Sequence, residues 1–407
     1  MVLGARSPTD TARTLARLDE VEVVIEKLVA GGDGLARVDG APLFIPLAAP
    51  GDRVRVRIVE RHPDFGRARI LEVLVPGPGR REPPCPHFMS CGGCDLQHLD
   101  DDLQTVLKAR AALETLRRLG RLDGLPEALL VRGRAWGYRL RAQVRTEPAG
   151  SGILVGYFAR ASHTLVPIRV CPILVPELEG AVTTLGRRLG PEAPRRLDVA
   201  AGDEERITAA PPIEALPRGP VTRRVGPWTY EYDARVFFQA HAGLLGDLQR
   251  EVCGRDQGEL AVDLYAGVGL FALPLARRYR RVIAVESDRV AARFAGRNAR
   301  ANGLANVEVA PRSAESFFAA PPPGIDRVVV DPPRTGLPRP LRRALLDAGA
   351  PRLTYASCHP ATLARDLRDL TAGYAVTGLT LLDLFPQTGH LEIVVQLTRT
   401  DSAGAAG

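Results

Sequence analysis

The chain has 407 residues, of which 45% are hydrophobic and 25% are charged. This apolar fraction excludes a largely disordered protein, and the length predicts two or three domains that each bury a core. No stretch approaches about 18 consecutive apolar residues. The first 20 residues lack a cationic start followed by an apolar block. We therefore expect a cytoplasmic protein that does not bind a membrane.

The chain is basic, with 54 Lys and Arg against 47 Asp and Glu, a formal net charge of +7. Only Lys27 and Lys108 are lysines, so nearly all of the positive charge is arginine. Guanidinium groups bind phosphate in a bidentate manner, which fits a nucleic-acid partner. The codon usage of a GC-rich genome explains the same composition equally well. Charge alone thus indicates only that an anionic partner is plausible.

The N-terminal part predicts a flexible start over 1–17 and a small β-barrel over 18–76. Short alternating segments are separated by Gly, Pro and Asp turns, such as Gly31 to Gly34. In the segment from Arg53 to Arg57, arginine and valine alternate, which predicts three guanidinium groups on one face of a strand. Such a face suits a nucleic-acid backbone. An ordinary solvated strand face is the alternative.

A central domain is expected over 77–232. It starts at a Pro and Gly linker, continues with a cysteine cluster, and then has an amphipathic helix over 101–119. Residues 136–207 read as strands with polar turns, and 209–227 read as a connector rich in Pro and Arg. The remainder, 233–407, alternates strand and helix with apolar strands. That pattern predicts a parallel sheet with helices on both faces, a Rossmann-like domain.

A nucleoside cofactor site is predicted where the buried run 260–264 ends. Asp263 is followed by a turn that contains Gly267 and Gly269, and Glu286 ends the next strand, where it can accept hydrogen bonds from ribose hydroxyls. Ala272 stands where a dinucleotide fold would have its last glycine. S-adenosylmethionine therefore fits better than NAD, because it needs no phosphate cradle.

Three further strand ends carry chemistry. Asp331 is followed by two prolines and Arg334, which predicts an acidic turn at the cofactor crevice. Cys358 lies on a sharp turn at the same edge, where a thiolate would be a nucleophile, although a lone cysteine elsewhere is more often a small buried hydrophobe. Glu392 begins an apolar strand and is a candidate proton acceptor, or else a strand cap or ion-pair partner.

Three of the six cysteines are clustered. Cys85, Cys91 and Cys94 are spaced by five and two residues, which fits a cubane iron–sulfur cluster better than zinc. A fourth ligand must come from elsewhere, and spacing alone does not choose between Cys171 and Cys253. Cys171 is favoured because it lies at a strand-to-turn position, whereas Cys253 lies on a helix of the other domain.

Together these residues make the chain resemble the RNA 5-methyluridine methyltransferases, and in particular the iron–sulfur branch that modifies bacterial 23S ribosomal RNA. The resemblance covers about residues 20–400. It implies that 18–76 is a TRAM domain, an OB-like RNA-binding barrel, and that a [4Fe-4S] cluster is held by the following residues: Cys85, Cys91, Cys94 and Cys171.

The resemblance also implies site roles. Cys358, in Tyr355-Ala-Ser-Cys-His-Pro, matches the family's nucleophile and Glu392, in His390-Leu-Glu, its general base. The cofactor-contacting positions that it implies are Gln239, Tyr265, Glu286 and Asp331. His359 and His241 stand where the family commonly has asparagine, and Leu270 stands where a polar residue is common.

The function expected from these observations is methylation of uridine C5 in RNA, most consistently 23S rRNA, by a monomer that uses S-adenosylmethionine. Cys358 would add to C6 of a uridine that has left its stack, and Glu392 would remove the C5 proton. A tRNA uridine methyltransferase, an amino-group methyltransferase and a non-catalytic iron–sulfur RNA-binding protein are the alternatives.

Overall fold

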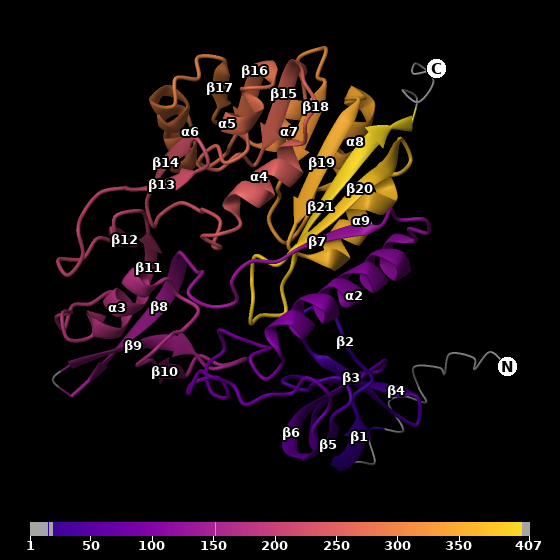
Figure 1. The fold of residues 1–407 in the computed structure, drawn as a ribbon, viewed down its shortest axis with the longest axis vertical. Helices are drawn as coiled ribbons and strands as arrows, with labels where there is room; N and C mark the ends of the chain where they lie inside the picture. The colour runs from indigo at the N-terminus through magenta and orange to yellow at the C-terminus, as the bar shows by residue number, and fades with distance from the viewer. Residues whose placement is uncertain (1–14, 16–18, 151, 401–407) are drawn as a thin grey trace. The chain divides into compact units, whose positions relative to one another are not determined.

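The computed structural model describes residues 15, 19–150 and 152–400 (Figure 1). The predicted flexible start, 1–17, lies outside the described residues except for Leu15. The chain divides into two compact units, 1–114 with 386–390, and 115–385 with 391–407. These units divide the chain at other positions than 76 and 232. The domain boundaries that we expect there remain predictions.

The first unit contains a six-stranded sheet in the order β1-β5-β6-β4-β3-β2. Its strands are β1 (Glu20–Val24), β2 (Lys27–Leu28), β3 (Gly34–Val38), β4 (Ala41–Ile45), β5 (Arg53–Arg61) and β6 (Gly66–Val75). All pairs are antiparallel except β4 with β6. Helix α2 (Asp101–Gly120) begins in this unit, as the amphipathic pattern predicts.

The alternation in β5 divides its side chains between core and solvent as predicted. Val54 and Val56 are fully buried, while Arg53 and Arg57 are exposed. Two of the three arginines already have carboxylate partners on neighbouring strands: Arg55 pairs with Glu22 and Glu72, and Arg57 pairs with Glu20. This face is therefore a lattice of exposed ion pairs rather than a row of unpaired cations.

The second unit contains a five-stranded antiparallel sheet in the order β10-β9-β8-β11-β12 and a hairpin, β13 with β14. Its elements are β8 (Arg141–Ala149), β9 (Gly152–Phe158), β10 (Leu165–Pro167), α3 (Pro176–Leu185), β11 (Arg196–Ala201), β12 (Ile207–Ala210), β13 (Val221–Val225) and β14 (Trp228–Tyr232). Two expectations are wrong here. Helix α3 lies within the region read as strands, and β13 lies within the expected connector.

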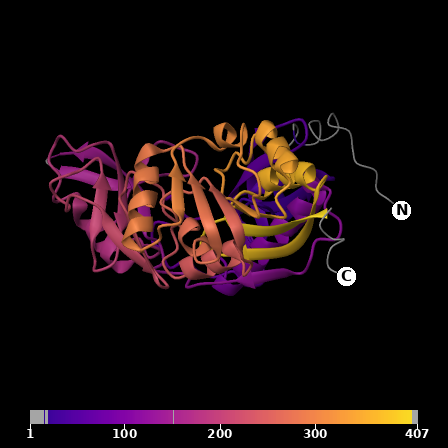
Figure 2. The ribbon, with the colours of Figure 1, turned by 90° about the horizontal axis from the view of Figure 1, so that it is seen from above.

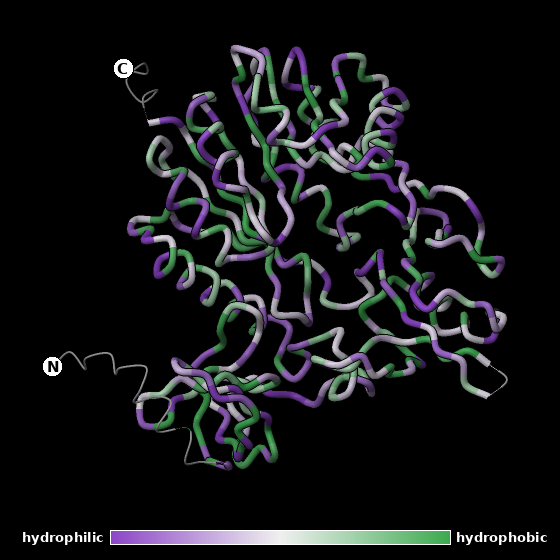
Figure 3. The backbone as a smooth tube through the Cα atoms, turned by 180° about the vertical axis from the view of Figure 1, so that it is seen from behind, coloured by the Kyte–Doolittle hydropathy of each residue, from purple (hydrophilic) through white to green (hydrophobic). Residues whose placement is uncertain are grey.

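The same unit contains an eight-stranded sheet in the order β17-β16-β15-β18-β19-β21-β20-β7. Its strands are β7 (Ala128–Val131), β15 (Gly258–Leu264), β16 (Tyr279–Val285), β17 (Val307–Ala310), β18 (Arg327–Val330), β19 (Arg352–Ser357), β20 (Tyr374–Leu382) and β21 (Glu392–Arg399). Figure 2 shows the yellow strands β20 and β21 side by side, as their register requires. Strand β18 and the last five residues of β15 are buried, and these segments are largely green, hydrophobic, in Figure 3.

The prediction of a purely parallel sheet is wrong. Strands β15 to β19 are parallel, but β21 runs antiparallel to both of its neighbours. The helices of this part are α4 (Leu245–Cys253), α5 (Ala272–Leu275), α6 (Arg289–Ala301), α7 (Ala314–Phe318), α8 (Arg339–Ala348) and α9 (Pro360–Leu370). Helix α6 begins where Asp288 accepts hydrogen bonds from two backbone amides, those of Val290 and Ala291.

Among the described residues, no helix is both long and apolar enough to cross a membrane.

Candidate active site

The topology brings the predicted site residues of the second unit to one edge of the eight-stranded sheet. Strands β16, β18 and β19 end at the same edge because they are parallel to β15. Since β21 is antiparallel to β19, with Ile393 opposite Ser357, its first residue lies at that edge too. The residues placed there are Glu286, Asp331, Cys358 and Glu392. Ligands of open α/β sheets bind at this edge.

The glycine loop after β15 adopts a left-handed backbone. The φ angles of Tyr265, Gly267 and Gly269 are 61°, 56° and 92°. For Tyr265 this conformation costs about 1–3 kcal/mol, a strain typical of functional loops. A Cβ on Gly267 would meet nothing within 4 Å, so the loop faces open space at this point.

The side chain of Glu286 ties this loop to the next strand. One carboxylate oxygen accepts a hydrogen bond from the Gly267 amide at 2.8 Å, and the other accepts one from the Asp288 amide at 2.7 Å. The carboxylate is thus held in one orientation at the end of β16. Its remaining lone pairs can accept hydrogen bonds from ribose hydroxyls, as the sequence predicts.

Gln239 and Asp331 contact each other, although 92 residues separate them. Gln239 is buried, and its Nε2 donates to Asp331 Oδ2 at 3.3 Å. Burial raises the pKa of Asp331 to about 7, against the opposing effect of this hydrogen bond. Within the described part of the chain, Gln239 Oε1 has no hydrogen-bond partner. A buried acceptor without a donor fits a bound polar molecule, so these residues suit the predicted cofactor.

Cys358 lies between β19 and α9 and is half-buried. Burial and the carboxyl groups of Glu392 and Asp331 raise the pKa of its thiol to about 11, while Arg334 lowers it by its charge and a hydrogen bond. Arg334 is a residue to which the sequence analysis assigned no role. The signal that could have identified it is its place directly after the two prolines that follow Asp331.

Glu392 is 2% exposed, and its Oε1 has no hydrogen-bond partner among the described residues. Burial, and then the charge of Asp331, raise the pKa of Glu392 well above the ordinary value. Asp263 shows the same behaviour on β15: burial, and then Asp331, raise its pKa, and both of its oxygens lack partners in the described structure. The edge therefore concentrates buried carboxyl groups that favour their protonated forms, an arrangement typical of active sites.

The structure shows the surroundings of all three departures and explains the one at His359. His359 Nδ1 accepts a hydrogen bond from the Thr362 amide at 3.3 Å and so caps α9, as an asparagine oxygen would. His241 is fully buried, stacks on Tyr138 and has a pKa lowered to about 4 by burial. The side chain of Leu270 is buried, and only its backbone oxygen accepts hydrogen bonds, from Tyr230 and Gln249.

The four cysteines predicted to hold the cluster are divided between the two units. Cys85, Cys91 and Cys94 belong to the first unit and Cys171 to the second. Over 19–150 and 152–400, no group of three or more His, Cys, Asp or Glu side chains is arranged to hold a metal ion. Cys253 is buried on α4, with its sulfur 3.7 Å from a backbone oxygen.

Two sequence families match parts of the chain. Residues 228–322 and 324–400 match the tRNA (Uracil-5-)-methyltransferase family, and residues 17–71 match the TRAM domain. The match to the first family includes Glu286, Asp331, Cys358 and Glu392.

Curated relatives match nearly the whole chain. A protein described as 23S rRNA (uracil(1939)-C(5))-methyltransferase RlmD, from Alkalilimnicola ehrlichii, is 34% identical, over 93% of this chain and 96% of its own. An uncharacterized RNA methyltransferase of Halalkalibacterium halodurans is 32% identical, over 93% of this chain and 97% of its own.

Among solved structures, the tRNA (uracil-54, C5)-methyltransferase of Pyrococcus abyssi, in complex with S-adenosyl-L-homocysteine, has a TM-score of 0.72. It covers 93% of this chain and 100% of its own, at 24% identity, and so shows a shared fold. The relatives, the two domain matches and the geometry of the sheet edge agree. The chain belongs to the TRAM-containing family of RNA uracil-5-methyltransferases.

Proposed function

We propose that this protein methylates C5 of a uridine in 23S rRNA through a covalent bond between Cys358 and C6 of the base. The observation that carries the proposal is that Cys358 directly follows β19 and Glu392 begins β21, the antiparallel neighbour of β19, with Asp331 at the same edge. The names of the curated relatives support 23S rRNA as the substrate.

Uracil C5 is a weak nucleophile until C6 carries an electron-rich substituent. In the proposed reaction the Cys358 thiolate adds to C6, and the ring becomes an enolate whose C5 bears the negative charge. Bound S-adenosylmethionine supplies the methyl group that C5 takes up. Glu392 then removes the proton from C5, the C5–C6 double bond reforms, and the thiolate leaves as it entered.

The environment of Glu392 suits this last step. Its raised pKa makes the deprotonated carboxylate a stronger base than an exposed glutamate. Its Oε1, which has no partner in the described structure, leaves an acceptor site for the C5 proton. Gln239 and Asp331 would orient the cofactor and the base, together with the following residues: Tyr265, Gly267, Gly269 and Glu286.

RNA that contains 5-fluorouridine at the target position tests the proposal. Thiolate addition and methylation leave fluorine on C5, so no proton can be removed and the protein remains bound to the RNA. We expect a denaturation-stable adduct that requires the cofactor. Cys358→Ala should abolish the adduct and methylation, whereas Cys253→Ala, the control at a buried thiol, should retain both.

The same assay separates the alternatives. An adduct with tRNA but not with 23S rRNA fragments would change the substrate. Methylation of an exocyclic amino group without an adduct would indicate amino-group chemistry, and binding without methylation would indicate a non-catalytic protein. Methylation by Cys358→Ala would overturn the mechanism.

We further propose a [4Fe-4S] cluster on Cys85, Cys91, Cys94 and Cys171, supported by their spacing and their thiol chemistry. No step of methyl transfer passes through it. Iron and acid-labile sulfide in anaerobically purified protein would support the cluster, and their absence at full methylation activity would contradict it. The proposal includes action as a monomer in the cytoplasm, and light scattering tests the monomer.

A further inference from the structure

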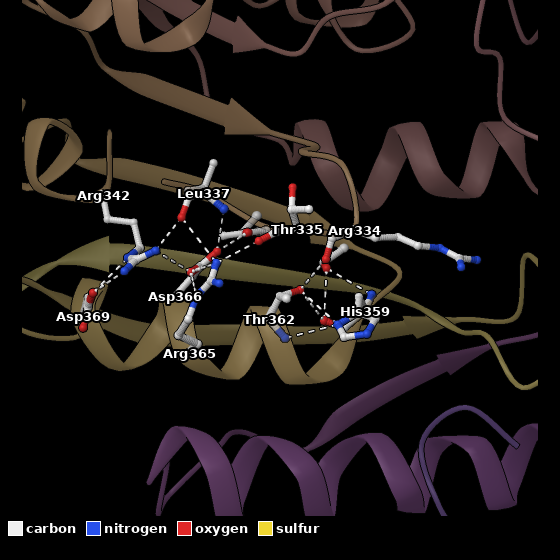
Figure 4. Close-up of polar contacts among 11 residues, drawn as sticks. Arg334, Thr335, Leu337, Arg342, His359, Thr362, Arg365, Asp366 and Asp369 are labelled. Atoms are coloured by element: carbon white, nitrogen blue, oxygen red, sulfur yellow. Dashed lines mark hydrogen bonds and ion pairs between the residues drawn. The ribbon is translucent and has the colours of Figure 1, made fainter. Parts of the chain in front are cut away.

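The segment from Asp331 to Leu337 connects β18 to α8 and carries Arg334, whose guanidinium lowers the pKa of the Cys358 thiol. The Arg334 side chain is exposed. In Figure 4 it extends away from the polar network that surrounds Asp366. The guanidinium hydrogen-bonds the Cys358 thiol, and its position also depends on how firmly the backbone of Arg334 is held.

Helix α9 holds this backbone at three positions. Thr362 Oγ1 donates to the Arg334 carbonyl at 3.0 Å. One turn later, Arg365 Nη2 donates to the Thr335 carbonyl at 2.9 Å. Asp366 Oδ2 then accepts from the Leu337 amide at 2.7 Å (Figure 4). The helix therefore runs beside the segment and positions it, and it starts two residues after the proposed nucleophile.

Asp366 is the centre of these contacts. Its carboxylate is fully buried and accepts hydrogen bonds from four groups: Leu337 N at 2.7 Å, Tyr355 Oη at 2.7 Å, Arg342 Nη1 at 2.8 Å and Arg365 Nε at 2.8 Å. Tyr355 belongs to β19, three residues before Cys358. One side chain thus connects the segment, helix α9 and the strand that ends at the thiol.

The approach of the segment to this carboxylate is very close. Gly336 has a φ of +72°, and a Cβ at this position would lie 2.4 Å from Asp366 Oδ2 and 2.8 Å from Arg365 Nη2. A larger residue therefore cannot enter without displacing the network. The glycine permits both the backbone angle and the contact.

We propose that Asp366 is a positioning residue for methyl transfer: by binding the segment 331–337 to α9, it holds the Arg334 guanidinium beside the Cys358 sulfur. The inference rests on the proposed function, because it assumes that the thiol reacts. Asp366 itself touches none of the reacting atoms.

The charged groups around the Cys358 sulfur explain why the position of the Arg334 guanidinium affects ionisation of the thiol. Glu392 on β21 and Asp331 in the segment raise the thiol pKa, and Arg334 lowers it. His359, the next residue along the chain, has a pKa lowered by burial and by Arg334 and Arg365, which favours its neutral form. If Arg334 moves away, the two carboxyl groups act unopposed by the guanidinium and fewer thiols ionise at a given pH.

The pH dependence of Cys358 alkylation by iodoacetamide, followed on the Cys358 peptide by mass spectrometry, tests the proposal. Only the thiolate reacts, so the alkylation rate reports thiol ionisation without RNA or cofactor. We expect Arg334→Gln to slow alkylation at neutral pH by roughly tenfold, and Asp366→Asn by several-fold. In the Arg334→Gln background, Asp366→Asn should add nothing, because it acts through that arginine.

Two further variants control the test. Asp369→Asn should leave the profile unchanged: Asp369 pairs with the same Arg342 but is not bonded to residues 334–337 within the described structure. Thr362→Val removes the bond to the Arg334 carbonyl with little change of shape. It should slow alkylation, as Asp366→Asn does. It serves as the test if Asp366→Asn does not fold.

The proposal would be overturned if Asp366→Asn protein, or Thr362→Val protein in its place, folds and keeps the wild-type alkylation profile. A residue with a purely structural role would change the free energy of unfolding and leave that profile unchanged. Equal slowing in the Arg334→Gln background would overturn it as well. The fluorouridine assay decides the proposed function separately, so the two failures are distinguishable.

Discussion

The buried carboxylates of the second unit lie in two opposite environments. Asp366 is surrounded by two guanidinium groups, a hydroxyl and a backbone amide. Glu392 and Asp263 have raised pKa values and oxygens without hydrogen-bond partners in the described structure. In the first environment both carboxylate oxygens have hydrogen-bond partners. The second keeps acceptors ready for a ligand, at a cost to stability that is typical of functional sites.

The largest effect should come from removing the carboxylate of Asp366, whose oxygens all have hydrogen-bond partners. Asp366→Ala leaves the buried Arg342 without its fully buried partner, so we expect a loss of about 3–5 kcal/mol in the free energy of unfolding. Urea unfolding measures it. Asp369→Ala, which removes a half-buried carboxylate from the same arginine, should cost clearly less. Equal losses would contradict the assignment of Asp366 as the centre.

Asp331, which raises the pKa values of Glu392 and Asp263 and has a raised pKa itself, should affect the pH dependence of stability. The folded protein holds the Asp331 proton up to a pKa of about 7, against 3.8 for the ordinary group. The folded state thus binds more protons than the unfolded chain between these values, and stability should fall as pH rises through this window. In Asp331→Asn protein, Tm should decrease less with rising pH than in the wild type. An equal decrease in both proteins would show that the pKa of Asp331 is not raised by folding.

A smaller effect is expected at Gln239, which donates a hydrogen bond to Asp331. Gln239→Ala removes the amide whose Oε1 awaits a donor, so S-adenosylmethionine should bind roughly tenfold more weakly, the value of about one hydrogen bond. Isothermal titration measures the affinity. Gln143→Ala, on β8 and paired with Asp198, is the control and should bind normally. Unchanged affinity in Gln239→Ala protein would exclude Gln239 from the cofactor site.

The smallest effect should come from a carboxylate in neither environment. Glu259 pairs with Arg280 at 3.5 Å, and their side chains are 75% and 83% exposed. Arg280→Gln should change the free energy of unfolding by less than about 0.5 kcal/mol. A loss of several kcal/mol in urea unfolding would show that exposure is a poor guide to the value of a charge pair here.

The strands and helices with strong local signals could be predicted from the sequence. The strands β15, β16 and β18 each contain a run of three or four mostly apolar residues, and α6 has an acidic cap and a glycine after its end. Helix α3 was missed because its valine and two threonines favour strands. The antiparallel direction of β21 was missed because apolar content is the same in either direction.

The site was predictable in its residues and not in its contacts. Asp331, Cys358 and Glu392 each stand at a strand end, which local patterns reveal. The four bonds to Asp366 join residues up to 29 positions away in the chain, and no local pattern encodes them. The partnerless oxygen of Gln239 depends on what packs around it, which only the folded chain determines.

The most direct test of the central claim uses Glu392→Gln protein with ordinary RNA and S-adenosylmethionine. With no base to remove the C5 proton, the methylated base should remain attached to the enzyme. Mass spectrometry of the digested complex should find 5-methylated uridine bound to the Cys358 peptide. Free methylated RNA released at the wild-type rate, or an adduct on any other residue, would contradict the account.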